Sequence, residues 1–151
     1  MKLKVFVIAL IAVFVTSCGS DVKKEDSTSK QLEKKTELKE IDPMQDKGVG
    51  PITNVTLAEI DEAMVAEGKA LFKTKCSACH KVSKRFVGPP MADITKRRTP
   101  EWIMNMILKP EVMVAENAAA KKLLAEYLSP MANQSLTEKE ARLILEYFRT
   151  L

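Results

Sequence analysis

Hydrophobic residues divide the chain into three parts with different patterns. Residues 5–15 form an unbroken apolar run, residues 19–55 carry few large apolar side chains, and residues 56–151 combine apolar stripes of helical period with short polar breaks. A stripe of helical period is typical of a helix that buries one face. The pattern therefore predicts an all-α domain over 56–151, preceded by a segment that cannot form a core.

The first helix of this domain is predicted from Leu57 to Lys75. Thr56 and Glu59 fit a capping box at its start. The apolar positions that follow at helical spacing are Ile60, Met64, Leu71 and Phe72. Gly68 interrupts the stripe at a cost of about 1 kcal/mol relative to alanine, which the close approach of another helix would explain.

The last helix is predicted from Thr137 to the end of the chain. Thr137 and Glu140 form a second capping box. The apolar stripe of this helix consists of Ala141, Ile144, Leu145 and Phe148. Each terminal helix of the domain therefore has one apolar face that needs a partner.

Two shorter helices are predicted between the terminal ones. One has Thr99 as its N-cap, Pro100 at its first position and an end before Pro110. Its apolar face is made by Trp102, Ile103, Met106 and Ile107. The other runs from about Asn117 to Leu128, and its inward residues are Leu123, Leu124, Tyr127 and Leu128. The intervening segments are expected to be loops.

The N-terminal apolar run is typical of an export signal. Lys2 and Lys4 precede it, and it is shorter than the roughly 20 residues of a membrane-spanning helix. It ends in Val15-Thr16-Ser17-Cys18, which resembles a bacterial lipobox, whose cysteine is lipidated. The sequence predicts a lipoprotein signal peptide over 1–17, a lipid on Cys18 and a place in the bacterial cell envelope, anchored to a membrane and facing the periplasm. The alternative is an ordinary signal peptide in which the cysteine is incidental.

Residues 18–55 are predicted to be the lipidated cysteine and a flexible charged tether. The segment 19–55 contains seven lysines and eight acidic residues, and it has too few large apolar side chains to form a core. Glycine and proline mark irregular chain near its end. Such a tether would keep the folded domain near the membrane while letting it turn towards its partners.

Two thiols followed by the only histidine of the chain form the motif Cys76-Ser77-Ala78-Cys79-His80. This spacing is typical of covalent haem c attachment, in which each sulfur forms a thioether with a vinyl group and the histidine becomes an axial iron ligand. The alternatives are a thioredoxin-like redox pair, half of a zinc site and a structural disulfide. A redox pair of this kind needs a βαβ setting, and a zinc site needs four ligands.

The residues around this motif resemble class I c-type cytochromes. The match is Gly68-x-x-x-Phe72-x-x-x-Cys76-Ser77-Ala78-Cys79-His80, and the resemblance covers about residues 56–151. It implies a small helical domain around one haem, whose terminal helices cross at Gly68 against an aromatic ring, here Tyr147. It also implies that the carbonyl of Pro89 accepts a hydrogen bond from His80. The residues alone also allow a half-buried aromatic and an ordinary proline loop at these positions.

The sixth iron ligand is predicted to be a methionine, because the chain has no second histidine. The methionines expected in loops are Met91, Met113 and Met131. In class I cytochromes the axial methionine lies just before the terminal helix, where this chain has Met131. The family often has proline after that methionine, whereas here Pro130 precedes it and Ala132 follows. Met113 and an open site are the alternatives, and each methionine is otherwise a core filler.

Basic residues are concentrated around the motif, although the net charge of +4 is too mild for general nucleic-acid binding. From residue 69 to 98 there are nine of them and one acid, Asp93. They are Lys69, Lys73, Lys75, Lys81, Lys84, Arg85, Lys96, Arg97 and Arg98. We expect a surface that steers a redox protein with an acidic patch, or a solvated face that offsets the haem propionates. Trp102 is either a core residue or an indole donor to a propionate.

Together these features predict a membrane-anchored monohaem cytochrome c that transfers single electrons between respiratory-chain partners and is not an enzyme. Ligation by His80 and Met131 would raise the haem potential, which suits such a carrier. The alternatives are a haem-based catalyst such as a peroxidase, or a ligand sensor. Both need an open or labile sixth position, and the chain has no second histidine to assist peroxide cleavage.

Overall fold

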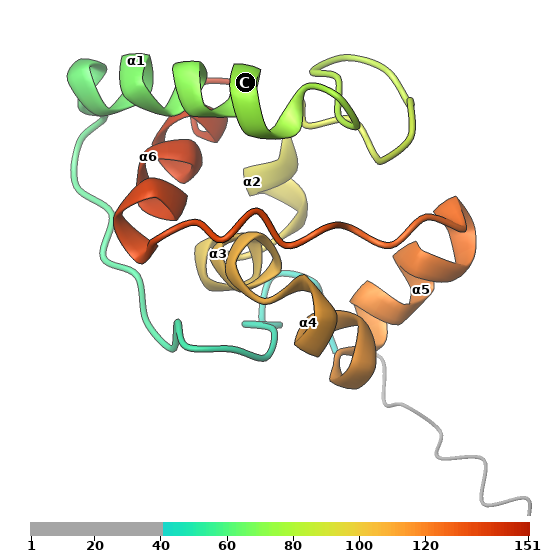
Figure 1. Ribbon diagram of the computed structural model, residues 1–151. Helices are drawn as coiled ribbons and strands as arrows, with labels where there is room; N and C mark the ends of the chain where they lie inside the picture. The colour runs from blue at the N-terminus through green and yellow to red at the C-terminus, as the bar shows by residue number, and fades with distance from the viewer. Residues whose placement is uncertain (1–40) are drawn as a thin grey trace, which may run out of the picture. The chain divides into compact units, whose positions relative to one another are not determined.

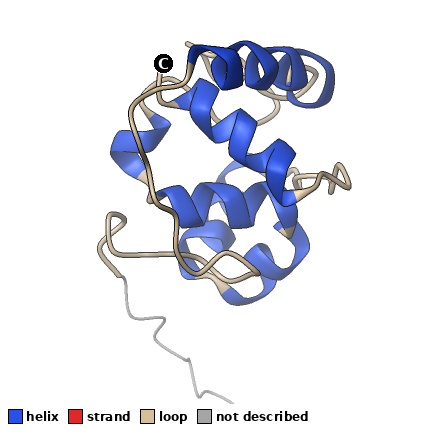
Figure 2. Ribbon diagram, turned by 90° about the vertical axis from the view of Figure 1, so that its left-hand side faces the viewer, coloured by secondary structure: helices blue, strands red, loops and turns tan. Residues whose placement is uncertain are grey.

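The computed structural model describes residues 41–151, which contain helices and loops but no strand (Figures 1 and 2). The elements are α1 (Glu62–Leu71), the π-helix η1 (Phe72–Cys76), α2 (Ile94–Arg97), α3 (Pro100–Leu108), α4 (Pro110–Glu116), α5 (Ala118–Tyr127) and α6 (Glu138–Phe148). The predicted all-α class is thus confirmed. None of these helices is long and apolar enough to cross a membrane. The signal peptide, Cys18 and the tether as far as residue 40 lie outside the described residues.

Helices α1 and α6 cross at close range, as Figure 1 shows. Gly68 is buried in this crossing, and a Cβ atom there would overlap the backbone carbonyl of Leu143 and lie 3.1 Å from the Cβ of Tyr147. The ring centroid of Phe72 lies 5.6 Å from that of Tyr147 and 5.7 Å from that of Phe148, within the range of favourable aromatic contacts. The crossing predicted at Gly68 against Tyr147 is therefore confirmed.

The start of α1 was predicted too early. The side chain of Asp61 caps the helix by accepting hydrogen bonds from the backbone N–H groups of Ala63 and Met64. Thr56 and Glu59 lie before the helix, because the chain there is extended and bonded to α6. The guanidinium of Arg149 donates to the Ala58 carbonyl (2.8 Å), and the Asp61 N–H donates to Glu146 (3.2 Å). These contacts outweigh the local capping preference.

The helix continues into the Cys-x-x-Cys-His motif through a single π-helical turn. In η1 the N–H of Ser77 reaches back to the carbonyl of Phe72 (3.0 Å), which is five residues away. Such turns are rare and occur mostly inside α-helices, often at functional sites. The periodicity of apolar residues predicted the continuous helix but not this widened turn.

The caps predicted for two other helices are present, and the helix predicted to begin at about Asn117 is capped by that residue. Thr99 accepts a hydrogen bond from the N–H of Trp102 at the start of α3, and Asn117 accepts one from Ala120 at the start of α5. Thr137 and Glu140 form the complete capping box of α6. Helix starts with a polar cap in the sequence were thus predictable wherever no tertiary contact competed.

The prediction missed two helices and gave one side chain the wrong orientation. The sequence pattern predicts neither α2 nor α4. In the case of α4, Pro110 not only follows the end of α3 but is itself the first residue of the next helix. Leu128 was expected to face inward but is 85% exposed, since it ends α5 in the left-handed conformation (φ 52°). A left-handed residue turns the chain out of the helix and redirects its side chain.

Residues 42–55, here called the N-terminal strap, pack against the helices instead of belonging to a free tether. The N–H of Ile52 donates to the side chain of Asn105 (2.9 Å), and that of Val55 donates to Glu101 (3.0 Å). Figure 1 shows the strap passing below α3 and behind α4. The predicted domain start at residue 56 is therefore wrong, since the folded part already includes the strap.

The strap is attached by hydrogen bonds to buried polar side chains. Asp46 is only 7% exposed, and its carboxylate accepts bonds of 2.9 Å from the amide of Asn117 at the start of α5. Thr99 donates to the Asp46 carbonyl (2.6 Å). Such contacts leave no hydrophobic pattern in the sequence, which is why the segment resembled a solvated tether.

Candidate functional site

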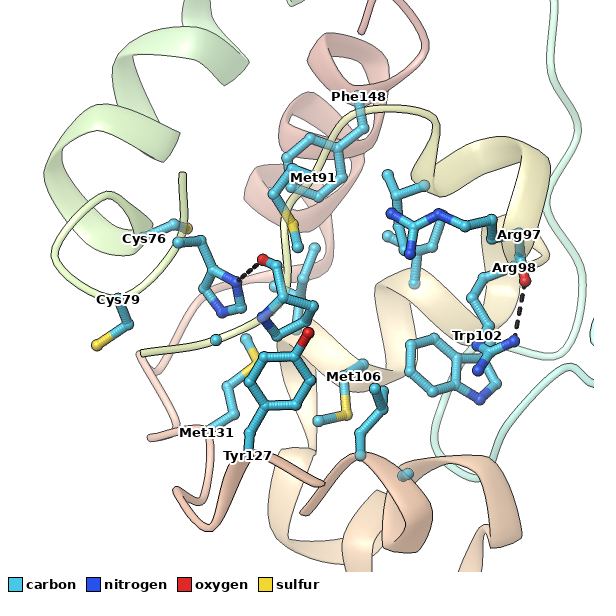
Figure 3. Close-up of a pocket in the computed structure, with 18 of the residues that line it drawn as sticks. Cys76, Cys79, Met91, Arg97, Arg98, Trp102, Met106, Tyr127, Met131 and Phe148 are labelled. Atoms are coloured by element: carbon cyan, nitrogen blue, oxygen red, sulfur yellow. Dashed lines mark hydrogen bonds between the residues drawn. The ribbon is translucent and has the colours of Figure 1, made fainter. Parts of the chain in front are cut away.

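A cavity of about 560 Å³ lies among α3, α5, α6 and the loop that follows Cys79 (Figure 3). Its wall is mostly apolar and includes Phe72, Met91, Trp102, Ile107, Leu123 and Phe148. The motif residues Cys76, Cys79 and His80 line the same cavity. Ligand cavities are commonly about 300–1,000 Å³ with apolar walls and a few polar groups, so both the size and the lining suit a large apolar cofactor.

The ring of His80 is held in one orientation by the loop that follows it. Its Nδ1 lies 3.0 Å from the carbonyl of Pro89, so that a proton on Nδ1 is donated to this oxygen and Nε2 is left to bind a metal. Gly88 allows the close approach, because a Cβ there would lie 2.5 Å from the Cε1 atom of the ring. The hydrogen bond predicted for Pro89 is thus present.

The two cysteines have different surroundings. Cys76 is half-buried and Cys79 is exposed, and the two do not form a disulfide. Burial raises the pKa of the Cys76 thiol to about 11, and the charge of Cys79 adds to the shift. A thioredoxin-like redox pair requires the opposite, a lowered pKa that makes the thiolate available at neutral pH. The redox-pair alternative is therefore disfavoured.

The zinc alternative has no support in residues 41–151. No group of three or more His, Cys, Asp or Glu side chains in this part of the chain is arranged to hold a metal ion. A structural zinc site needs four such ligands.

Three methionines reach the cavity from different parts of the chain, as Figure 3 shows. They are Met91 from the loop after His80, Met106 from α3 and Met131 from the segment between α5 and α6. The alternative ligand Met113 does not line the cavity. It lies in α4 rather than in a loop, is fully buried, and its sulfur accepts a hydrogen bond from the N–H of Val49 at 3.1 Å. Met131 therefore remains the leading candidate of the two.

Trp102 lies in the wall of the cavity, but its indole N–H is already used. It donates to the side chain of Asn117 (3.2 Å), which in turn binds Asp46 of the strap. Trp102 is 3% exposed, so the core assignment is confirmed. The hydrogen bond to Asn117 disfavours the alternative, donation to a propionate.

Two arginines were missed as site residues because they were counted only as surface charge. Arg97 and Arg98 both line the cavity. Arg97 also donates to the carbonyls of Pro90 and Ala92 (3.0 and 2.9 Å), which fixes the loop that carries Pro89. The guanidinium of Arg98 lies 4.9 Å from the centre of the Trp102 ring. The available signal was the basic run Lys96-Arg97-Arg98, which begins shortly after the Gly88-Pro89-Pro90 segment.

The residues of the cavity fit the haem predicted from the sequence. Two thiols on one turn suit the two vinyl groups, an oriented imidazole and a thioether suit the iron, and the arginines suit the carboxylates. The apolar wall suits the macrocycle. The donor set is therefore complete within one cavity.

Comparison with known proteins gives consistent matches. The family model described as cytochrome c matches residues 65–151. A cytochrome c from Rhodothermus marinus is 45% identical with a TM-score of 0.66, and the alignment covers 67% of this chain and 88% of that one. An engineered form of the Rhodothermus protein bound to a carbene intermediate is 45% identical, with a TM-score of 0.63 and the same coverage.

A more distant structural match has the same fold. The cytochrome c domain of a Pseudomonas putida protein is 28% identical with a TM-score of 0.51, and the alignment covers 55% of this chain and 85% of that domain. The search of curated proteins gives no significant match.

Proposed function

This chain belongs to the cytochrome c family and carries one covalently attached haem c, and from that premise we propose that it transfers single electrons rather than catalysing a reaction. The observation that supports this function is the placement of His80 and Met131 in the wall of one apolar cavity. The haem, when bound, supplies an iron that gains or loses one electron. With His80 and Met131 both holding the iron, no ligand position would be left open for a substrate.

The protein's own groups adjust that iron in three ways. The carbonyl of Pro89 orients the His80 ring and makes it a better electron donor. The thioether of Met131, as the second ligand, raises the reduction potential relative to a second imidazole. The apolar wall excludes water and disfavours the more highly charged oxidised form. All three effects belong to a carrier that changes oxidation state without changing its ligands.

Replacing Met131 tests the proposal. The oxidised Met131→Ala protein should lose its sulfur-to-iron charge-transfer band, whereas a Met106→Ala control, which alters another cavity methionine, should keep it. The reduced wild-type protein should resist carbon monoxide, and Met131→Ala should bind it rapidly. A band that survives in Met131→Ala would contradict ligation by this residue.

A haem-based catalyst or ligand sensor is the second candidate. An engineered relative holds a carbene intermediate, and this supports a ligand-accessible iron in that protein. Rapid binding of carbon monoxide by the reduced wild-type protein at neutral pH would favour this second function over electron transfer.

We further propose a respiratory redox partner with an acidic patch. Four basic residues line the cavity itself, namely Lys75, Lys96, Arg97 and Arg98. Complementary charge raises the rate of encounter more than the affinity, and salt screens it over about 8 Å at 0.15 M. Electron transfer with the natural partner should therefore slow as ionic strength rises through this value. A rate independent of salt would contradict the docking surface.

The proposed membrane anchor is a lipid on Cys18, in the cell envelope and on the periplasmic side. It is supported by the lipobox-like sequence and by haem attachment, which takes place outside the bacterial inner membrane. Since the strap is folded, the proposed tether is reduced to about residues 18–41. A Cys18→Ser protein should move from the membrane fraction to the soluble fraction after cell breakage. Retention in the membrane fraction would contradict the lipid anchor.

A further inference from the structure

Arg85 connects the loop after His80 to the end of α5, about 40 positions later in the chain. Its Nη1 donates to the Glu126 carboxylate (2.8 Å) and its Nη2 to the backbone carbonyl of the same residue (3.0 Å). Its guanidinium also lies 4.0 Å from the centre of the Tyr127 ring. These three contacts, here called the Arg85 bridge, join two segments that each lead to a proposed iron ligand.

On one side, the backbone around Arg85 is tied closely to the haem-binding motif. The N–H of Gly88 donates to the Cys79 carbonyl (2.9 Å), and the N–H of Phe86 donates to the Gly88 carbonyl (3.1 Å). The loop is therefore folded back on the residues next to His80. A side chain at position 85 has a fixed starting point relative to the proximal ligand.

On the other side, the bridge contacts the end of the helix that leads to Met131. The carbonyl of Glu126 belongs to the last turn of α5, where carbonyls have no partner within the helix. Tyr127 itself lines the cavity. Leu128 then turns the chain, and no backbone–backbone hydrogen bond within the described residues involves positions 129–132.

The position of Met131 therefore depends on how its segment is fixed at both ends. After it, the side chain of Asn133 donates to the Leu108 carbonyl at 3.3 Å. Before it, the nearest fixed point is the end of α5 with the Arg85 bridge. Exposed ion pairs alone contribute little, and the Arg85 and Glu126 side chains are 55% and 51% exposed. The bond to the Glu126 carbonyl and the stacking on Tyr127 make this bridge more than a surface ion pair.

We propose that Arg85 is a positioning residue that holds the Met131 segment in place and so determines how readily an external ligand replaces Met131 at the iron. The inference rests on the proposed ligation by Met131. Loss of the bridge frees the end of α5 and the segment beyond it, which has no backbone–backbone hydrogen bond at positions 129–132, so that the thioether leaves the iron more often. The bridge thus favours the state in which Met131 is bound to the iron over the state in which an external ligand has replaced it.

The test is imidazole binding to the oxidised holoprotein at fixed ionic strength, followed together with the charge-transfer band. Arg85→Gln should bind imidazole about tenfold more tightly than wild type, which corresponds to the loss of a charge-assisted hydrogen bond and a cation–π contact. Arg85→Lys should fall between the two, because lysine keeps the charge but not the paired geometry. Lys84→Gln is the matched control and should leave binding unchanged, since Lys84 makes no hydrogen bond or ion pair within residues 41–151.

A second pair of variants shows whether Arg85 acts through Met131. In a Met131→Ala background, Arg85→Gln should have no further effect on imidazole binding, because the ligand that it positions is gone. An equal effect in both backgrounds would overturn the proposal in favour of general loosening. Binding by Arg85→Gln equal to wild type would also overturn it. If the wild-type protein lacked the charge-transfer band, ligation of the iron by Met131 would be wrong. The proposed function that depends on this ligand and the positioning role of Arg85 would then both be overturned.

Discussion

The α1–α6 crossing and the N-terminal strap both close the domain, but they are held by different chemistry. At the crossing, Gly68 lies against the backbone of α6, and the ring of Phe72 packs on two aromatic side chains of that helix. The strap instead makes directional contacts, such as those from its backbone to Asn105 and from Asp46 to Asn117. The crossing is attached mainly by buried apolar surface, whereas the strap combines the partial burial of Val49, Ile52 and Val55 with hydrogen bonds to buried polar side chains.

This difference in chemistry indicates whether each region can separate from the domain independently of the other. Apolar packing loses its contribution all at once when two helices separate, because the buried surface is shared. A hydrogen-bonded strap can detach and exchange its partners for water at a smaller net cost, since each bond contributes about 1 kcal/mol. The crossing should therefore control global stability, whereas the strap should open locally.

The largest effect is expected from Gly68→Val. The added side chain would overlap the Leu143 carbonyl and the base of Tyr147, so the helices must separate. The free energy of unfolding should fall by about 3 kcal/mol or more, as for severe overpacking. Urea denaturation of the holoprotein, followed by circular dichroism, measures this change.

Ala70→Val is the control that measures the cost of valine's lower helix propensity alone, because Ala70 is exposed on the same helix and lies away from the crossing. This control should cost only about 0.6 kcal/mol. If the two valine variants were equally stable, the close approach of α1 and α6 would not be what stabilises the fold.

An intermediate effect is expected from Asn105→Leu. The Asn105 side chain is 1% exposed, accepts a bond from the Ile52 N–H, and donates to the carbonyls of Lys47 (3.0 Å) and Ile52 (2.9 Å). A leucine of similar size leaves these strap groups without partners, which should cost about 2 kcal/mol. Hydrogen exchange should show lost protection at the Ile52 amide and unchanged protection in α6.

Asn54→Leu is the matched control, because Asn54 is an exposed strap residue with no hydrogen bond among the described residues. It should leave exchange unchanged throughout. Equal loss of protection in the strap and in α6 after Asn105→Leu would show that the two regions unfold together, contrary to the comparison.

The features that could be predicted from the sequence are those that one local signal decides. The caps at Thr99 and Thr137, the glycine at the crossing and the haem motif each depend on residues close together in the chain or on one steric requirement. Met113 shows the opposite case. Its sulfur is bonded to the strap backbone, 64 positions away, and nothing in the local sequence indicates this.

The residues that bind haem could be predicted from the sequence, but the contacts that hold them in position could not. The motif gave His80 directly, and the family resemblance gave Pro89 and Met131. The bonds of Arg97 to the Pro89 loop, and the Arg85 bridge, depend on the positions of long flexible side chains in the folded chain. Charge counts described these arginines only as part of a basic surface.

The smallest effect is expected at Glu146, which joins α6 to the start of α1 at the crossing. Glu146 lies on α6, is 1% exposed, pairs with Arg142 and Arg149, and accepts the Asp61 N–H that follows the extended chain from the strap. Burial alone would raise the pKa of Glu146, but the hydrogen bonds from these groups outweigh it and keep the pKa below its usual range. Glu146→Gln should cost about 1.5 kcal/mol at pH 7, because a neutral amide replaces a paired carboxylate.

The sign of the pH dependence follows from the lowered pKa. A carboxyl whose pKa is lower in the folded protein contributes stability that is fully present above its unfolded pKa, about 4.3, and is lost as the pH falls through the folded value. The stability difference between wild type and Glu146→Gln should therefore be constant near neutral pH and shrink in acid, whereas an exposed control, Glu116→Gln, should show no such change. A difference that grew towards low pH would mean that Glu146 is held protonated, and that it binds Asp61, Arg142 and Arg149 as a neutral hydrogen-bonding group instead of as a paired carboxylate.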